Sequence, residues 1–282
     1  MIGPMRAILV LAAGLVFLAG LQLTVFPLRT ADWFAWTIDA PMTAVFLGAA
    51  YWSSAVLELA GAGSIAWSRA RLAVWSVLAF TTITLLVTLV HLDRFHLGAD
   101  EPASARIVTF GWLAIYAGVP AAIAVGIGLQ ARSRVPEPGS RSLRRPLPTG
   151  LGVLLTVLAA VLLVSGAALL LVPASVSGAW PWPLTDLTAS AIGAWLVGLG
   201  WASAHARLID DVAWVQPLGL TGVAFVVLEA IALVRYGEQL AWSSAGAVAY
   251  VALLGAIGIA AVWIVALGRV RAADAGERAR TR

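Results

Sequence analysis

The sequence predicts an all-α integral membrane protein of eight transmembrane helices. Hydrophobic residues make up 61% of the chain and charged residues 11%, and the mean hydropathy is +0.93. A soluble domain contains about 25% charged residues. Because so few polar residues cannot cover a water-facing surface, the expected solvent is lipid. A membrane β-barrel is not indicated, since the apolar runs lack the required alternation of polar and apolar residues.

Eight apolar runs reach the length of about 20 residues that a helix needs to cross a bilayer. They are residues 6–26, 41–61, 71–92, 108–130, 150–172, 187–206, 213–234 and 245–268. The first run is longer than the apolar core of about 7–15 residues in a signal peptide. It also has a counterpart in the middle of the chain. We therefore expect it to be retained as a helix.

The arginines predict the orientation of these helices. Of the 18 basic residues, all of them arginine, fourteen fall on one side of the predicted membrane. The four on the other side are Arg29, Arg94, Arg106 and Arg235. Because cytoplasmic loops are enriched in basic residues, both termini are expected in the cytoplasm. The chain contains no Lys or Asn, whose codons are AT-rich, which indicates a bacterial genome and hence the bacterial inner (plasma) membrane.

The two halves of the chain resemble each other. Trp33 recurs 147 residues later as Trp180, and Arg94 recurs 141 residues later as Arg235. The spacing shortens only across loops, as expected of a duplicated unit. Each unit has an even number of spans, so the sequence predicts two parallel four-helix repeats related by a pseudo-twofold axis along the membrane normal. The predicted segments are a first repeat (1–130), a cytoplasmic Arg- and Pro-rich linker (131–148), a second repeat (149–270) and a cytoplasmic tail (271–282).

Small residues are candidates for helix contacts, because close packing drives helix association in lipid. The candidates include Gly48 in the second span and Gly193 in the sixth. Gly118 in the fourth span and Gly255 in the eighth are further candidates.

Glu229, Glu58 and His205 are ionisable side chains inside predicted spans, and such a side chain costs about 2.5–3.5 kcal/mol at a helix centre. Glu229 lies in the seventh span, and the residue at the corresponding position of the first repeat is Thr88. It is a candidate proton, cation or ligand site; the alternative is a carboxyl bonded to a neighbouring helix. Glu58 and His205 occupy equivalent positions at the cytoplasmic ends of the second and sixth spans. They are candidates for a shared proton; the alternative is a structural role at the helix ends.

The third span places Thr81, Thr84, Thr88 and His91 on one helical stripe. This stripe predicts either a water or ligand path or interior packing in which each Thr bonds its own helix. His91 and His96 point to different faces of a helix, and His91 and His205 lie at opposite membrane ends. We therefore expect no metal site, haem or other cofactor.

The loops before the second and sixth spans are aromatic. They contain Trp33, Trp36, Trp180 and Trp182. These side chains predict an outer aromatic rim at the membrane surface. The alternative is a lid over an outer vestibule, with Asp39 and Asp186 at the entrances of the two helices.

These features favour a small-solute or ion transporter (permease) with a cavity between the repeats. Enzymatic activity is not indicated, because the sequence lacks the phosphate-binding, metalloprotease and nucleophile-elbow motifs. The alternative is a non-catalytic membrane scaffold or sensor subunit that binds another membrane protein, or a further copy of itself. The expected partners are the lipid bilayer and a small solute or ion. Nucleic acid is not expected, since the high pI rests on few charges.

Overall fold

The computed structural model describes residues 1–133 and 145–280 and is 84% helical, with no strand in that part of the chain. Eight of its helices are long and apolar enough to cross a membrane, which confirms the predicted number. They are α1 (Gly3–Val25), α3 (Pro41–Gly63), α4 (Trp67–Val90), α5 (Ala103–Arg132), α6 (Thr149–Leu171), α8 (Asp186–Ile209), α9 (Val212–Tyr236) and α10 (Ala245–Arg280). The centre of the predicted linker, residues 134–144, lies outside the described residues.

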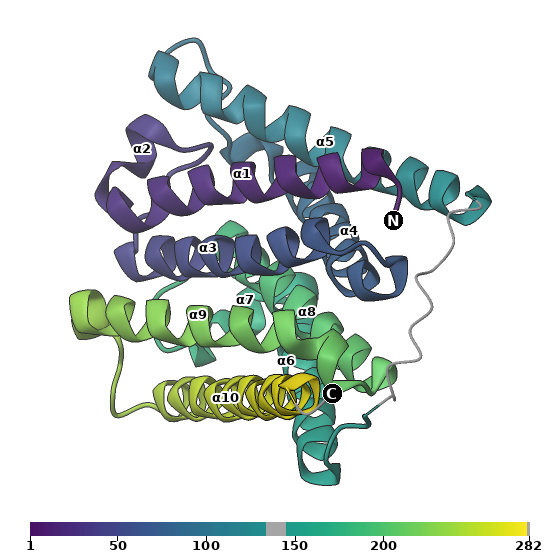
Figure 1. The fold of residues 1–282 in the computed structure, drawn as a ribbon. Helices are drawn as coiled ribbons and strands as arrows, with labels where there is room; N and C mark the ends of the chain where they lie inside the picture. The colour runs from purple at the N-terminus through teal and green to yellow at the C-terminus, as the bar shows by residue number, and fades with distance from the viewer. Residues whose placement is uncertain (134–144, 281–282) are drawn as a thin grey trace.

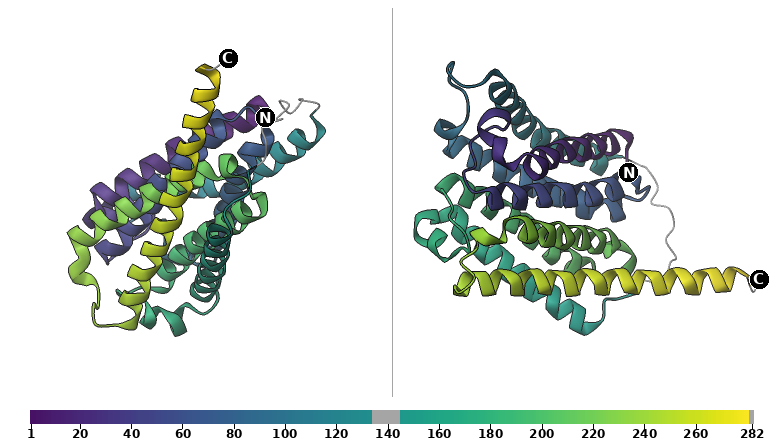
Figure 2. Two further views of the ribbon diagram at one scale, coloured as in Figure 1. Left: turned by 60° about the horizontal axis from the view of Figure 1, so that its bottom comes forward. Right: turned by 90° about the vertical axis from the view of Figure 1, so that its left-hand side faces the viewer.

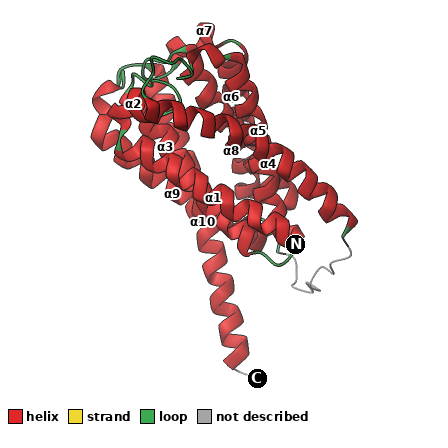
Figure 3. Ribbon diagram, turned by 90° about the horizontal axis from the view of Figure 1, so that it is seen from above, coloured by secondary structure: helices red, strands yellow, loops and turns green. Residues whose placement is uncertain are grey.

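The ends of the helices form two faces, here named the terminal face and the loop face. The terminal face holds both chain ends, and α10 projects beyond it (Figure 2). The loop face lies opposite, where the loops gather beside α2 and α7 (Figure 3). Six short helices lie in its connections: η1 (Pro27–Arg29), α2 (Thr30–Trp33), η2 (Leu92–Arg94), α7 (Pro173–Val176), η3 (Ser177–Ala179) and η4 (Gly237–Gln239).

Local sequence signals set several helix ends. Pro41 opens α3, a position where its missing N–H is not needed. Thr185 and Thr188 form a capping box at the start of α8. Asp210 ends α8 in the left-handed region, at φ 48°, and Asp211 caps α9 by accepting a hydrogen bond from Ala213 N. Since short polar side chains tolerate the left-handed region, two residues suffice to reverse the chain.

The eight helices form two layers of four. In one layer α1, α3, α9 and α10 lie side by side, as Figure 1 shows. In the other, α5 packs on α4, α4 on α8 and α8 on α6. The layers meet where α3 contacts α4 and α8 contacts α9. Each layer therefore contains two helices from each half of the chain, and within each layer the two helices of one half are neighbours, so the halves pack side by side through α3, α4, α8 and α9.

Burial separates central from lipid-facing helices. In the most apolar stretches of α3 and α8, 72% and 78% of residues are buried, against 22% in α5 and α10. Large apolar side chains cover the outer helices, including Leu171 (79% exposed) and Val234 (89% exposed). Exposed apolar surface of this extent is unstable in water. The chain is therefore a polytopic membrane protein whose outer helices contact lipid.

Glycines allow the closest helix contact, between α6 and α8. A Cβ atom on Gly193 would lie 2.8 Å from the carbonyl oxygen of Gly166, and the same distance separates a Cβ on Gly166 from the oxygen of Gly193. Gly48 is similarly close to Thr24 of α1. The predicted contacts at Gly118 and Gly255 are wrong, because no atom lies within 4 Å of a Cβ at either position.

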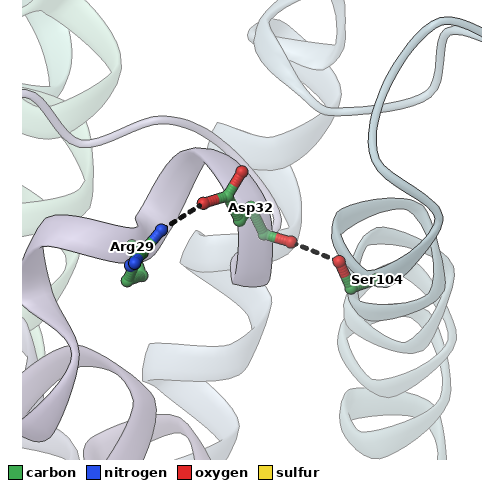
Figure 4. A network of polar contacts seen from close by, with 3 residues as sticks. All are labelled: Arg29, Asp32 and Ser104. Carbon is green, nitrogen blue, oxygen red and sulfur yellow. Dashed lines mark hydrogen bonds and ion pairs between the residues drawn. The ribbon is translucent and has the colours of Figure 1, made fainter.

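A polar network joins α2 to α5 at the loop face (Figure 4). Arg29 forms an ion pair with Asp32, with 3.4 Å between Nη1 and Oδ2. The hydroxyl of Ser104 donates a hydrogen bond to the Asp32 carbonyl oxygen over 2.6 Å. Because the ion pair is about half exposed, it contributes little to stability, and the network mainly fixes the position of the loop.

Candidate functional site

An acidic basin of about 710 Å³ opens at the loop face. Its wall comes from the loop before α3, the end of α4 with the following loop, and the start of α8. The acidic side chains in the wall are Asp39, Asp93, Glu101 and Asp186. Arg94 is the one arginine in that wall, and it pairs with Asp93 over 3.1 Å. The basin therefore has excess negative charge, and Asp39 and Asp186 lie in it together.

The two histidines near the basin differ in role. His96 is buried; its Nδ1 lies 2.8 Å from the carbonyl oxygen of Phe34 and its Nε2 lies 3.0 Å from Oγ1 of Thr37. Since a carbonyl oxygen only accepts, Nδ1 donates, and His96 anchors the loop before α3. His91 lines the basin, and its Nε2 lies 3.4 Å from Oγ of Ser190 on α8. No group of three or more potential metal ligands occurs among the described residues.

Aromatic rings narrow the space beneath the basin. The ring centroids of Phe80 on α4 and Trp195 on α8 are 3.9 Å apart, and Tyr51 on α3 meets Trp195 edge to face at 4.9 Å. The cavity left between these rings, the helices and the loops is about 10 Å³. A water molecule needs at least about 10–15 Å³ on this measure, so the passage is closed. We name it the aromatic constriction.

The threonine stripe of α4 lies against this constriction. Thr84 and Thr88 line it, whereas Thr81 bonds to the carbonyl oxygen of Val77 in its own helix. Thr88 donates to the carbonyl oxygen of Thr84 and accepts from the indole Nε1 of Trp112 over 3.0 Å. Thr84 Oγ1 has no partner among the described residues. The stripe thus combines helix-internal bonds with one free hydroxyl at the constriction.

A third cavity, of about 50 Å³, lies at the junction of α3, α4, α8 and α9 toward the terminal face. We name it the Glu58 cavity. Glu58 is 3% exposed and Ser76 is 7% exposed, and both line it. Glu58 Oε2 and Ser76 Oγ are buried without a hydrogen-bond partner in the described chain. About three water molecules fit in such a volume.

The expected partner of Glu58 is not beside it. His205 stacks on Trp201 of its own helix, with 6.2 Å between the ring centroids. No hydrogen bond or ion pair joins Glu58 to His205 within residues 1–133 and 145–269. His205 is also absent from the wall of the Glu58 cavity. The structure thus assigns Glu58 to the cavity and His205 to the periphery of α8.

Glu229 lies in a different place from the Thr stripe. It is fully buried on α9, and the hydroxyl of Tyr250 on α10 donates to its Oε2 over 2.6 Å. Its Oε1 has no partner among the described residues. Glu229 lines neither the basin, the constriction nor the Glu58 cavity. Its contact is therefore a buried pair between α9 and α10.

We expect Tyr250→Phe to destabilise the fold by about 1–3 kcal/mol, because it leaves both carboxyl oxygens of Glu229 without a donor. Thermal unfolding in detergent micelles measures the change. Tyr236→Phe is the control, since its hydroxyl meets Arg235 at an exposed site. That variant should stay within about 0.5 kcal/mol of wild type. Equal stability of the two variants would contradict the assigned pair.

The aromatic loops also depart from a surface rim. Trp36 and Trp182 are 3% and 2% exposed, whereas Trp33 is 40% exposed. Trp36 packs edge to face on Trp112 at 4.9 Å. Trp182 donates from Nε1 to Thr43 Oγ1 over 2.8 Å and meets Tyr250 edge to face at 5.2 Å. The loops fold inward because both indoles find ring partners inside the bundle, and Trp182 finds a hydrogen-bond partner as well. The indole nitrogen of Trp36 is buried without a partner among the described residues.

The three cavities share walls. Trp36 and Leu187 line both the basin and the constriction. Phe80 and Trp195 line both the constriction and the Glu58 cavity. A row of cavities therefore leads from the loop face into the half of the bundle near the terminal face. The paired rings of Phe80 and Trp195 lie between the constriction, of about 10 Å³, and the Glu58 cavity, of about 50 Å³.

Of the constriction, Trp36, Thr84 and Thr88 were singled out from the sequence, but the rings of Tyr51, Phe80 and Trp195 were not, although a signal for two of them exists. Trp195 corresponds to Gly48 at the spacing of 147, and Tyr51 corresponds to Gly198. A large ring in one half thus replaces a glycine in the other. Differences between the halves at aromatic positions would have identified both.

Comparison with protein-family models, with curated proteins and with solved structures finds no match for this chain.

Proposed function

We propose that this membrane protein transports a small cation along the row of cavities between α3, α4, α8 and α9. The shared walls of the three cavities are the observation on which the proposal rests. A wide basin on one side and a closed aromatic passage below it correspond to a pathway held shut at its centre. Apolar constrictions of this kind block ions because water does not fill them.

The basin favours cations over other solutes. Its four carboxylates exceed its one arginine, so the local electrostatic potential attracts positive charge. With the termini in the cytoplasm, as the arginine distribution predicts, the basin opens to the outside. Captured cations would then enter from the exterior and meet the constriction next.

The arrangement of helices supports an origin by duplication. A twofold exchange of α1 with α6, α3 with α8, α4 with α9 and α5 with α10 converts one layer into the other. The pairing of α3 with α9 then corresponds to that of α8 with α4. The polar contacts match under the same exchange of helices. Trp112 of α5 donates to Thr88 of α4, and Tyr250 of α10 donates to Glu229 of α9. On this proposal, the cavities lie near the axis between two repeats.

The two halves differ at the loop face. At the position corresponding to the basin, Met42 N donates to Gln239 Oε1 over 3.0 Å, and Trp182 fills the space beside Thr43. The proposed pathway therefore has one entrance rather than two. On this proposal, duplication accounts for the arrangement of the eight helices, whereas the basin forms only beside the loop before α3 and not at the corresponding position of the second half.

Flux into proteoliposomes tests the proposal. Vesicles containing the purified protein should take up small cations such as Na⁺, K⁺ or choline faster than empty vesicles. Chloride and glucose should not enter faster. Flux equal to that of empty vesicles across the panel would refute the proposal.

The basin carboxylates give a second arm of this assay. Asp39→Asn combined with Asp186→Asn should lower uptake at low cation concentration by about tenfold, because the field that concentrates cations is weakened. The loss should shrink in high salt, which screens exposed charges. Asp32→Asn is the matched control, since Asp32 lies on the same face but pairs with Arg29 outside the basin.

A further inference from the structure

The Glu58 cavity has more hydrogen-bond acceptors than donors in its wall. The hydroxyl of Ser53 on α3 donates to the carbonyl oxygen of Ala50, and that of Thr221 on α9 donates to the carbonyl oxygen of Pro217. Each hydroxyl has one proton, so these two side chains can offer only oxygen lone pairs to the cavity. The hydroxyl of Ser54 is within reach of both the carbonyl oxygen of Tyr51 and the carboxyl of Glu58, and it can donate to only one of them at a time.

The two remaining polar side chains reinforce this imbalance. Glu58 adds carboxyl oxygens, one of which has no partner in the described chain. Ser76 is the one hydroxyl in the wall whose proton is not committed to a recorded bond. Several acceptors thus face a single free donor. A ligand that fits this wall must supply positive charge or protons.

No basic side chain of the described residues neutralises Glu58. Arg71 of α4 lies over the ring of Trp214, 5.7 Å from its centroid. Arg6 of α1 donates to the carbonyl oxygen of Ala62. From α8 the nearest titratable group is His205, outside the cavity wall, and from α5 it is the hydroxyl of Tyr116, which bonds to Tyr51 over 2.7 Å. α9 contributes only apolar side chains and Thr221 to the wall.

An unpaired carboxylate in this setting is costly, because a charge removed from water needs a compensating partner. Hard monovalent cations prefer oxygen ligands, and the cavity offers carboxylate and hydroxyl oxygens with room for about three waters. We propose that the Glu58 cavity binds Na⁺ in exchange with the proton of Glu58. The inference rests on the proposed function and supplies the pathway with a coupling-ion site.

Carbodiimide labelling of the wild-type protein in proteoliposomes tests the site. Dicyclohexylcarbodiimide modifies protonated carboxyls in apolar surroundings, and peptide mass spectrometry locates the modified residue. At fixed pH and ionic strength, replacing choline with Na⁺ should slow labelling of Glu58 by about tenfold or more. K⁺ at the same concentration is the control for a salt effect and should protect Glu58 less than Na⁺.

Variants distinguish Na⁺ binding by the side chains of the cavity from a general effect of salt on labelling. Ser76→Ala should raise the Na⁺ concentration that half-protects Glu58 by about tenfold, because one oxygen ligand is lost. Thr81→Val is the matched control on the same helix. Thr81 does not line the cavity, and its hydroxyl donates to the backbone carbonyl oxygen of Val77, so protection should equal that of wild type. Glu58→Gln identifies the labelled peptide by losing the signal.

Two outcomes would overturn the inference: labelling of Glu58 that does not respond to Na⁺, and an absence of labelling at Glu58 at every pH. The assay needs no transported solute. Absence of Na⁺ protection with flux intact would therefore reject the ion site alone. Ion protection without flux would instead reject the proposed transport function.

Discussion

Gly193→Leu should destabilise the protein by about 3 kcal/mol or more. The Cβ of any side chain at this position would lie 2.8 Å from the carbonyl oxygen of Gly166 and about as close to Leu169 and Leu170 of α6. The first of these atoms belongs to the backbone, so α6 and α8 must separate. Overpacking that moves backbone costs at the upper end of the 1–3 kcal/mol range or beyond. Because α8 also lines all three cavities, the pathway should be disrupted as well.

The measurement is the midpoint of thermal unfolding in detergent, followed by fluorescence-detected size exclusion. Gly255→Leu provides the matched control, since Gly255 lies in α10 with no atom within 4 Å of a Cβ. It introduces the same side chain into a transmembrane helix at an open position and should unfold at the wild-type temperature. If both variants lost stability equally, the close approach of α6 and α8 would not be the cause.

Trp195→Ala should convert the closed pathway into a leak. Removing the indole that stacks on Phe80 joins the constriction to the Glu58 cavity and lets water fill the gap. A barrier lowered by about 1.4 kcal/mol raises flux tenfold, so passive cation flux should increase about tenfold or more. Flux should also lose its selectivity among small cations, because hydrated ions then pass without contacting the rings.

Two further variants separate gating from damage. Phe80→Ala removes the other ring of the pair and should produce a similar leak from an independent position. Trp201→Ala removes an indole of the same helix that is 40% exposed and outside the constriction. It should leave flux at the wild-type level. Folded Trp195→Ala and Phe80→Ala proteins without any leak would exclude the constriction as the closed point of the pathway.

Composition and run length sufficed to predict the eight helices, because the bilayer thickness imposes one length on every span. Asp39 and Asp186 were predicted to lie at the entrances of the second and sixth spans, and both line the basin. The pairing of helices could not be predicted in the same way. Helices in lipid associate through side-chain shape, which hydropathy does not record. Gly193 and Gly255 are both glycines in apolar helices and look alike in sequence. A Cβ at Gly193 would meet the backbone of α6, whereas a Cβ at Gly255 would meet no atom within 4 Å.

The candidate site was predictable only in part for a related reason. Glu58, Thr84, Thr88 and His91 stood out as polar residues in apolar runs, and each lines part of the row of cavities. Glu229 stood out equally but pairs with Tyr250 elsewhere. Phe80 and Trp195 did not stand out, because aromatic residues are ordinary in a membrane helix. Their role arises from the 3.9 Å contact that the fold creates.

The side-by-side packing of the two halves has a consequence for biogenesis. The ribosome delivers α3 and α4 to the membrane long before α8 and α9, the helices that cover them in the finished protein. During that interval Glu58 and Ser76 lack the cavity walls that α8 and α9 supply. Polar side chains left facing lipid are costly, so the first four helices expose an unfavourable surface until the second half inserts beside them. We therefore expect quality control in the membrane to recognise this intermediate through the face that α8 and α9 later cover.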